Sequence, residues 1–261
     1  MGVVTSRDIP DVGKIGAIRR EGMGETTVPE HPVLADSKVF YVGQPIAFVI
    51  AETRATARDA LESIHVTYEP LGTVLKPSES VDPTVPILHP EIGTNVVMHA
   101  KAGSGDVDTA FATAEHLIKG SYEVPRLVAS PMECRGVVAR FDDDHDELTI
   151  WSSTQVPHRV KTYLGSILPN PPKNIRVIAP DVGGGFGRKI EVWPEEILCA
   201  HMSIKLGRPI KWLEERSENM RASHGRGFSA TVEAAVNSAG VIAGMRIRTV
   251  SYTHLRAHET E

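Results

Sequence analysis

The sequence of 261 residues predicts an α+β fold made of two units joined by a linker. Three observations predict this fold class. Short β-rich runs alternate with segments whose apolar residues recur every three or four positions. Residues 81–103 contain several prolines and no sustained periodicity, which is typical of a linker. The later strands are separated by hairpin turns rather than by regular βαβ crossovers.

The first unit, residues 2–80, is predicted to be a small α/β arrangement. Thr53 is expected to cap a helix over 54–64, because a hydroxyl at that position can accept from a free backbone N–H group. The apolar residues of this helix fall on one stripe, which favours packing against a sheet. The expected strands begin at Val3 and lie at 39–42, 46–51 and 65–68.

The second unit, residues 104–250, is predicted to mix helices and antiparallel strands. Proline suits the first turn of a helix and glycine suits the position just after its end, and both signals occur here. Gly120 is expected to lie in a turn, and Asn237–Gly240 to close a hairpin. The expected helices run from Asp106, from Pro157 to Leu168 and from Pro194 to Gly207, and the expected strands lie at 121–124, 135–141, 148–152, 175–178, 210–213, 229–236 and 241–250.

Composition excludes several classes of function. A net charge of −5 disfavours non-specific nucleic-acid binding, which needs a basic face. No apolar run approaches the roughly 20 residues of a membrane span, and the first residues do not resemble a secretory signal. Cys134 and Cys199 form no CxxC pair and no disulfide framework. We expect a protein of the reducing cytoplasm.

A glycine-rich loop at 181–189 is the most informative segment, with four glycines in five positions from Gly183 to Gly187. Such a backbone can approach a ligand closely, and its successive N–H groups can bind an anion. A phosphate-binding P-loop and a dinucleotide fingerprint both require glycine at the position of Arg188, so neither pattern fits. A tight turn that only connects a strand to a helix explains the glycines equally well.

Two further segments carry polar groups at expected junctions. Gln155 follows a predicted strand and offers a neutral amide to a ligand, although an amide that bonds its own backbone is a simpler role. Glu133 and Arg135 are expected to pair across a turn, and Cys134 to be a small core residue. No nucleophile with a base, no useful carboxylate pair and no metal-ligand cluster emerges from spacing alone.

In their order along the chain, these segments resemble the large, molybdopterin-binding subunit of the molybdenum hydroxylases, the family of xanthine dehydrogenase, aldehyde oxidase and aerobic carbon monoxide dehydrogenase. The resemblance covers nearly all of 2–250 and implies an α/β hammerhead domain over 2–80 and the first molybdopterin-binding domain over 104–250. It is carried by residues 31–47 and 57–70, then by 105–111, 131–133, 153–158, 183–189 and 207–212.

The resemblance also implies roles for particular residues. The family's glutamine beside the molybdenum oxo ligands corresponds to Gln155. The loop that surrounds the metal end of the cofactor corresponds to Gly184, Gly185, Phe186 and Gly187. No side chain of this chain is expected to ligate the metal, and the general-base glutamate of the family is expected beyond residue 261. The catalytic carboxylate is therefore expected outside this sequence.

The implied parent protein is a molybdopterin-dependent oxidoreductase. It would oxidise an aldehyde, an N-heterocycle or carbon monoxide with water as oxygen donor. Its cofactor would be molybdopterin with molybdenum, in the cytosine dinucleotide form. Electrons would pass to centres on an iron–sulfur small subunit and an FAD-binding medium subunit. Ile190 replaces a glutamate that is frequent in xanthine- and aldehyde-type members, which favours the carbon monoxide dehydrogenase-like branch.

Two other functions are left open by the residues themselves, a non-catalytic ligand-binding module and a nucleotide-binding enzyme that uses the glycine-rich loop. The resemblance further implies a fragment, with strands missing before residue 2 and a second domain truncated after 250. Residues 251–261 resemble a translated sequencing adapter and are expected to be a non-native tail. The fragment alone is expected to be inactive.

Overall fold

The computed structural model describes residues 2–16, 29–222, 225 and 227–251. The chain divides into two compact units, each formed by segments that are distant in sequence. Unit 1 comprises residues 1–16, 30–69 and 128–224, and unit 2 comprises 17–29, 70–127 and 225–261. The units therefore interleave along the chain, and the linker predicted at 81–103 belongs to unit 2. The domain boundaries predicted from sequence, 2–80 and 104–250, are a separate matter from these compact units and stay a prediction.

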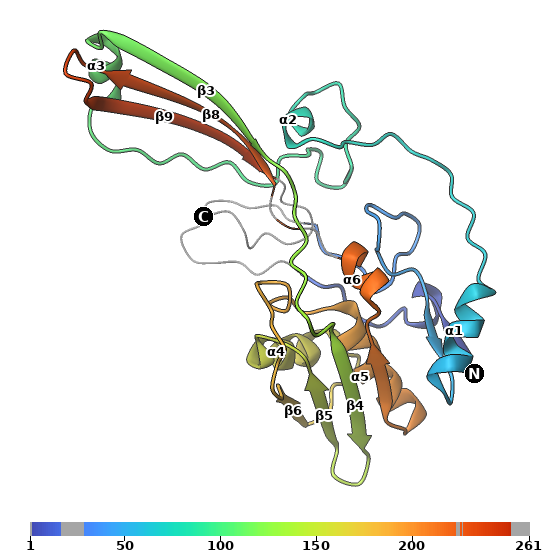
Figure 1. Ribbon diagram of the computed structural model, residues 1–261. Helices are drawn as coiled ribbons and strands as arrows, with labels where there is room; N and C mark the ends of the chain where they lie inside the picture. The colour runs from blue at the N-terminus through green and yellow to red at the C-terminus, as the bar shows by residue number, and fades with distance from the viewer. Residues whose placement is uncertain (1, 17–28, 223–224, 226, 252–261) are drawn as a thin grey trace. The chain divides into compact units, whose positions relative to one another are not determined.

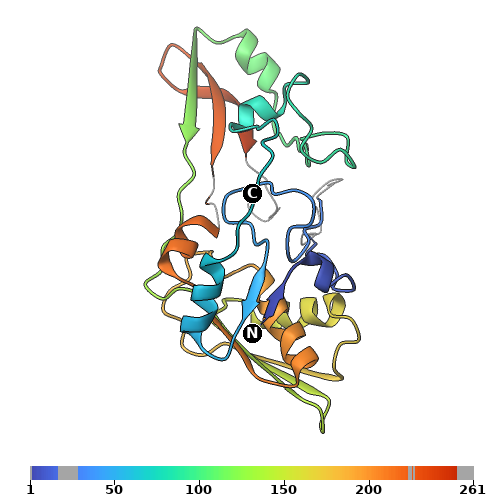
Figure 2. The same cartoon turned by 90° about the vertical axis from the view of Figure 1, so that its right-hand side faces the viewer.

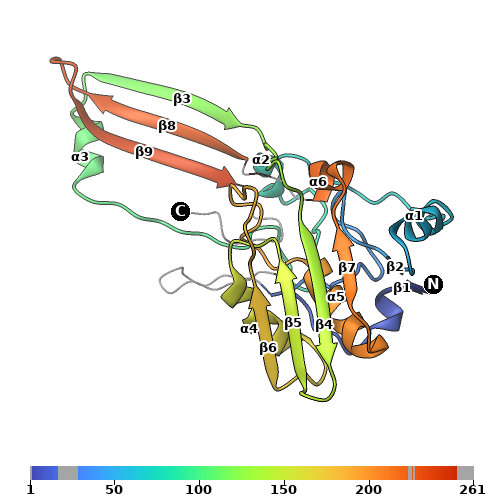
Figure 3. The same ribbon diagram turned by 60° about the horizontal axis from the view of Figure 1, so that its bottom comes forward.

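Within the described residues, unit 1 contains a four-stranded mixed sheet in the order β6-β5-β4-β7 (Figure 3). Its strands are β4 (Gly136–Asp142), β5 (Glu147–Ser152), β6 (Asn174–Ile178) and β7 (Ile210–Leu213). β4 is antiparallel to both β5 and β7, whereas β5 and β6 are parallel. Helix α4 (Pro157–Ile167) connects the parallel pair. This connection is a βαβ crossover, so the expectation of hairpins without such crossovers is wrong here.

Helices α4 and α5 (Pro194–Leu206) pack on this sheet and contribute apolar side chains to its core. Val160, Leu164 and Ile167 of α4 are buried, as their spacing predicted. Both helices begin with proline, and Gly207 ends α5 in the left-handed conformation that glycine adopts without strain. The predicted bounds of both helices are therefore confirmed to within a residue.

The N-terminal segments of unit 1 share this core instead of building their own. β1 (Gly2–Val4) pairs antiparallel with β2 (Phe48–Ile50), as Figure 2 shows beside α1 (Arg54–Glu62). Val4, Leu34 and Phe48 are buried in the same cluster as the sheet and helix residues. The remaining helices of this unit are the short 3-10 helix η1 (Ser6–Asp8) and α6 (Arg216–Ala222).

Unit 2 contains an antiparallel three-stranded sheet in the order β3-β8-β9 (Figure 1). Its strands are β3 (His116–Val124), β8 (Phe228–Val236) and β9 (Ile242–Ser251), and its helices are α2 (Pro77–Ser80) and α3 (Val107–Ala112). Ala110 of α3 lies close above Gly244 of β9. Leu117, Ile118 and Ile247 are more than half exposed. This sheet therefore presents apolar side chains that the described residues leave exposed.

Several predicted elements are confirmed and others are wrong. Thr53 and Asp106 cap their helices through side-chain oxygens, and Asn237 closes the β8–β9 hairpin. The strand predicted at 39–42 is instead a bend, because the Phe40 N–H group donates to Gln44 Oε1. No strand forms at 65–68, and the α1 stripe has no buried residue.

Gly120 also differs from the prediction, since it lies within β3 opposite Val232 and not in a turn. Residues 81–103, which are described throughout, form turns and no named helix or strand. The tail predicted at 251–261 lies outside the described residues except for Ser251, which ends β9.

Candidate active-site loop and its supports

Gln155 and the glycine-rich loop lie together because β5 and β6 are parallel neighbours. Trp151 near the end of β5 is opposite Ile178 at the end of β6. The carboxyl ends of the two strands therefore lie at one edge of the sheet, where ligands of α/β layers usually bind. Gln155 follows the first of these ends, and the loop follows the second.

The backbone of Lys189 fixes Gln155 against the loop. The Gln155 N–H group donates to the Lys189 carbonyl at 2.8 Å, and the Lys189 N–H group donates to Gln155 Oε1 at 3.3 Å. A Cβ atom on Gly185 would lie 2.5 Å from Gln155 Cδ, which leaves no space for a side chain. The predicted adjacency of Gln155 and the 184–187 loop is thus confirmed, and the absence of a Cβ atom at Gly185 permits this close approach.

The tip of the loop presents backbone donors. Gly184, Phe186 and Gly187 have positive φ angles of 93°, 52° and 81°. Among the described residues no acceptor is found for the N–H groups of Gly185, Phe186 and Gly187, and a Cβ atom on Gly187 would meet open space. Consecutive N–H groups in such a turn form a concave site for an anionic or electron-rich ligand. The Phe186 side chain is 77% exposed beside them.

The carboxylate of Glu133 supports both ends of the loop. Glu133 Oε2 accepts from Lys189 Nζ at 2.7 Å, from Ser153 Oγ at 2.7 Å and from the Gly183 N–H group at 2.8 Å. Partial burial acts to raise the pKa of Glu133, but these three donors outweigh it and lower the pKa below its ordinary value. The predicted pairing of Glu133 with Arg135 is wrong, because Glu133 pairs with Lys189 instead.

Arg135 belongs to a different, buried network. Its guanidinium lies 3.6 Å from the centroid of the Trp193 ring and donates to the carboxylates of Glu195 and Glu214. Burial would raise the pKa of Glu214, but Arg135 lowers it to about 2. Arg188 joins the network through Glu214 and the Asn219 carbonyl. These contacts anchor the C-terminal end of the loop in the core.

Glu196 of α5 is buried next to this network. It accepts from the Ser152 hydroxyl at 2.5 Å and from the Trp193 N–H group at 2.9 Å. Burial raises its pKa to about 7, because these bonds compensate only part of the lost hydration. Sequence reasoning did not identify Lys189, Glu196 or Glu214. The only local signal was the placement of acidic residues in the first turn of α5.

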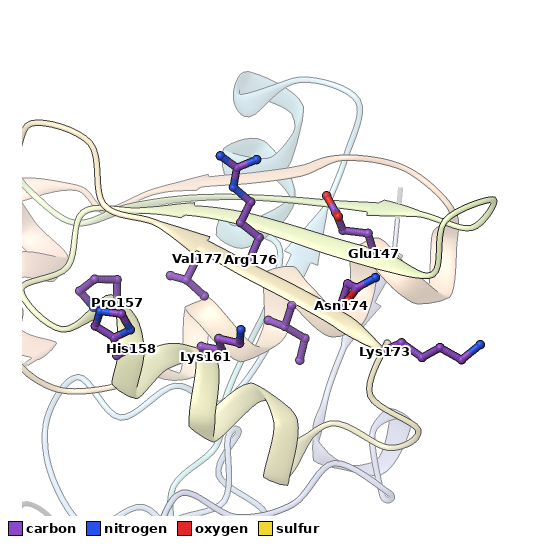
Figure 4. A pocket seen from close by; sticks show the side chains of 9 residues that line it. Glu147, Pro157, His158, Lys161, Lys173, Asn174, Arg176 and Val177 are labelled. Atoms are coloured by element: carbon purple, nitrogen blue, oxygen red, sulfur yellow. The ribbon is translucent and has the colours of Figure 1, made fainter.

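A pocket of about 380 Å³ lies elsewhere in unit 1, between α4 and β6 (Figure 4). Neither Gln155 nor any loop residue lines it. Lys161 and Arg176 extend to opposite sides of β6 in Figure 4, and Lys173 points away. The positive charges therefore do not converge on one ligand position. The part of the chain that the structure describes contains no group of three or more candidate metal ligands.

None of the helices described in the structure is long and apolar enough to cross a membrane. Cys134 is partly exposed and Cys199 is buried, and both are free thiols. Burial raises the pKa of the Cys199 thiol well above its ordinary value, which disfavours the reactive thiolate. Among the described residues, the Gln155 amide and the backbone of the loop remain the candidate groups for binding a ligand.

Two family models match the chain. Residues 88–254 match the molybdopterin cofactor-binding domain, which includes Gln155 and the whole loop. Residues 1–72 match the a/b hammerhead domain of aldehyde oxidase and xanthine dehydrogenase. The two matches occur in the order hammerhead domain and then molybdopterin-binding domain.

The chain is also similar in sequence to the large subunits of known enzymes. The chain is 42% identical to the nicotine 6-hydroxylase large subunit of Paenarthrobacter nicotinovorans over 82% of its own length and 26% of that subunit. It is 36% identical to the carbon monoxide dehydrogenase large chain of Afipia carboxidovorans, over 82% of its length and 28% of that chain.

Among solved structures, quinoline 2-oxidoreductase from Pseudomonas putida 86 superposes with a TM-score of 0.87 at 30% identity. This match covers 95% of the chain and 32% of the solved one. The chain thus spans between a quarter and a third of the proteins that it matches. It belongs to the molybdopterin-binding large-subunit family of the molybdenum hydroxylases.

Proposed function

We propose that the full-length protein is a molybdenum hydroxylase and that this chain supplies one wall of its cofactor site. The observation that carries the proposal is the set of three backbone N–H groups at Gly185–Gly187, held open beside the Gln155 amide. Family membership makes a pterin-bound molybdenum the group that such a site would take.

The residues present fit this group. The loop offers hydrogen-bond donors without a charged side chain, and the open side of Gly187 leaves space for a ligand atom close to the backbone. Gln155 Oε1 is engaged by the Lys189 N–H group, so the Nε2 amino group is the part of the amide left to donate to a ligand. When bound, molybdopterin would supply the two-electron oxidation in which water provides the oxygen atom.

Each loop residue has a distinct part in this proposal. The N–H groups of Gly185, Phe186 and Gly187 would donate to the metal end of the cofactor, while Gly184 permits the turn through its positive φ. The exposed Phe186 ring would exclude water from one side of the site. No residue of this chain is assigned the general base, and the glutamate that performs this role is proposed to lie beyond residue 261.

The substrate is proposed to be an N-heterocycle, an aldehyde or carbon monoxide. Relatives named as a nicotine hydroxylase and as carbon monoxide dehydrogenases support the first and last of these. The cytosine dinucleotide form of the cofactor, an iron–sulfur small subunit and an FAD-binding medium subunit remain part of the proposal, as does a cytoplasmic location. Family membership disfavours the nucleotide-binding alternative, and a measured turnover would exclude a purely ligand-binding module.

Metal analysis and isotope incorporation test the proposal on the purified full-length protein. We expect about one molybdenum atom per polypeptide, release of CMP after acid hydrolysis, and ¹⁸O from labelled water in the product of nicotine, benzaldehyde or carbon monoxide. A protein that purifies without molybdenum when a known hydroxylase loads normally in the same host would refute it. Molybdenum without turnover on any of the three would favour the ligand-binding module.

A further inference from the structure

We propose that Glu133 and Lys189 are positioning residues that hold the glycine-rich loop closed and keep the Gln155 amide in one orientation. The inference rests on the proposed function, because the orientation matters only if Gln155 faces a reacting group. It concerns the cluster formed by the Glu133 carboxylate, the Lys189 ammonium, the Ser153 hydroxyl and the Gly183 N–H group, which we term the Glu133 cluster.

The side chain of Lys189 lies in the protein interior. The residue is 1% exposed and its side chain is fully buried, although lysine is among the residues least often found inside proteins. A buried ammonium is tolerated only when it is paired and hydrogen-bonded. Its partner is Glu133 Oε2 at 2.7 Å. An apolar side chain of similar length would fill the same space, so volume alone does not explain a charge here.

Three hydrogen-bond donors converge on one oxygen of the Glu133 carboxylate. Glu133 Oε2 accepts hydrogen bonds from the Gly183 N–H group at the start of the loop and from Lys189 Nζ at its end. It also accepts one from Ser153 Oγ, in the segment that leads to Gln155. These three donors come from two separate chain segments that leave adjacent parallel strands. A single carboxylate therefore ties both ends of the loop to each other and to the Gln155 segment.

The backbone of Lys189 fixes the orientation of the Gln155 amide. A backbone N–H group can only donate, so the Lys189 N–H bond selects the oxygen of the amide and leaves Nε2 for the open side. Thr154 Oγ1 and the Gln155 N–H group both donate to the Lys189 carbonyl. The main chain of Lys189 thus determines where the amide points, while its side chain determines where that main chain lies.

The test uses the full-length holoenzyme with Lys189→Met, Glu133→Gln, the double variant, and Lys161→Met as control. Methionine keeps an unbranched side chain, one heavy atom shorter than that of lysine, without the charge. Lys161 is an exposed lysine in α4 of the same unit. The readouts are kcat per bound molybdenum, KM, molybdenum content, and hydrogen exchange of residues 153–155 and 183–189.

For Lys189→Met we expect kcat per molybdenum to fall about tenfold, while KM changes less than about twofold. A tenfold fall is within the range seen when residues that hydrogen-bond the groups around a metal are replaced. Exchange of 183–189 should accelerate relative to the control. Glu133→Gln should be more severe, because it leaves the ammonium buried without a carboxylate. The double variant should recover part of that loss, since it removes both charges together.

Unchanged kcat per molybdenum in Lys189→Met would overturn the inference, as would exchange rates equal to those of Lys161→Met. A fall in stability and molybdenum content at constant kcat per molybdenum would also overturn it, because that pattern indicates only structural support. A wild-type protein without molybdenum is a different outcome. It would refute the proposed function, whereas exchange on the same sample would still report whether the Glu133 cluster holds the loop.

Discussion

Replacing Gly185 with alanine would place a methyl group where the Gln155 side chain lies. The added Cβ would be 2.5 Å from Gln155 Cδ and 2.8 Å from Cγ. Carbon atoms attract at separations of about 3.5–4.0 Å and repel well inside that range. The Gln155 side chain must therefore withdraw by about 1 Å or rotate away from the loop.

The fold should tolerate this change better than the site does. Gly185 is not among the residues with positive φ, so alanine can adopt its backbone conformation. Withdrawal of Gln155 removes the bond from the Lys189 N–H group, which should lower the free energy of unfolding by about 1 kcal/mol. A displacement of about 1 Å at a reacting group can lower turnover about 100-fold. The predicted effect is thus large on kcat and small on stability.

Steady-state kinetics per molybdenum atom and urea denaturation of the full-length enzyme would measure both quantities. Gly165→Ala is the matched control, because it makes the same chemical change in α4 of the same unit and its added Cβ meets no atom within 4 Å. The control should keep wild-type turnover. Wild-type turnover in Gly185→Ala would refute the reasoning that contact with the loop positions Gln155 for function.

Three further predictions follow from the same residues. Gln155→Ala should lower turnover while changing the melting temperature by only a few degrees, and extensive unfolding in circular dichroism would instead indicate a structural role. The free energy of unfolding should fall by about 3 kcal/mol as pH rises from about 4.5 to about 7, because folded Glu196 keeps a proton that the unfolded chain releases. Urea denaturation at several pH values should show this decrease in the wild type and its loss in Glu196→Gln. The 261-residue chain expressed alone should retain no molybdenum and should self-associate in light scattering. Self-association is expected because apolar residues such as Leu117 and Ile247 are exposed on unit 2. A monodisperse, molybdenum-loaded monomer would contradict both expectations.

Helices α4 and α5 could be predicted from sequence because their signals are local. Proline at the start, apolar residues at helical spacing and glycine at the end all act within one or two turns. The helix starts at Thr53 and Asp106 could be predicted for the same reason, since each side chain accepts a hydrogen bond from the N–H group three residues later. The physics of a helix end involves few residues beyond the helix itself.

Strand assignments failed where distant partners decide them. Gly120 was expected in a turn, yet it pairs in β3 with Val232, more than 100 residues away. The β-rich run at 39–42 formed no strand, because Gln44 bonds the backbone of Phe40 and no neighbouring strand pairs with it in the described residues. Strand formation depends on such cross-strand partners, and local propensity does not specify them.

The sequence by itself determined the components of the candidate site, namely the Gln155 segment, the glycine-rich loop, and their order along the chain, which matches a known family. Only the tertiary structure decided that these components meet, because parallel pairing of β5 and β6 puts their carboxyl ends at one edge. It also replaced the expected pair of Glu133 and Arg135 with Glu133 and Lys189, which are 56 positions apart. Burial selects such partners, since a charge removed from water must meet an opposite charge wherever the fold places one.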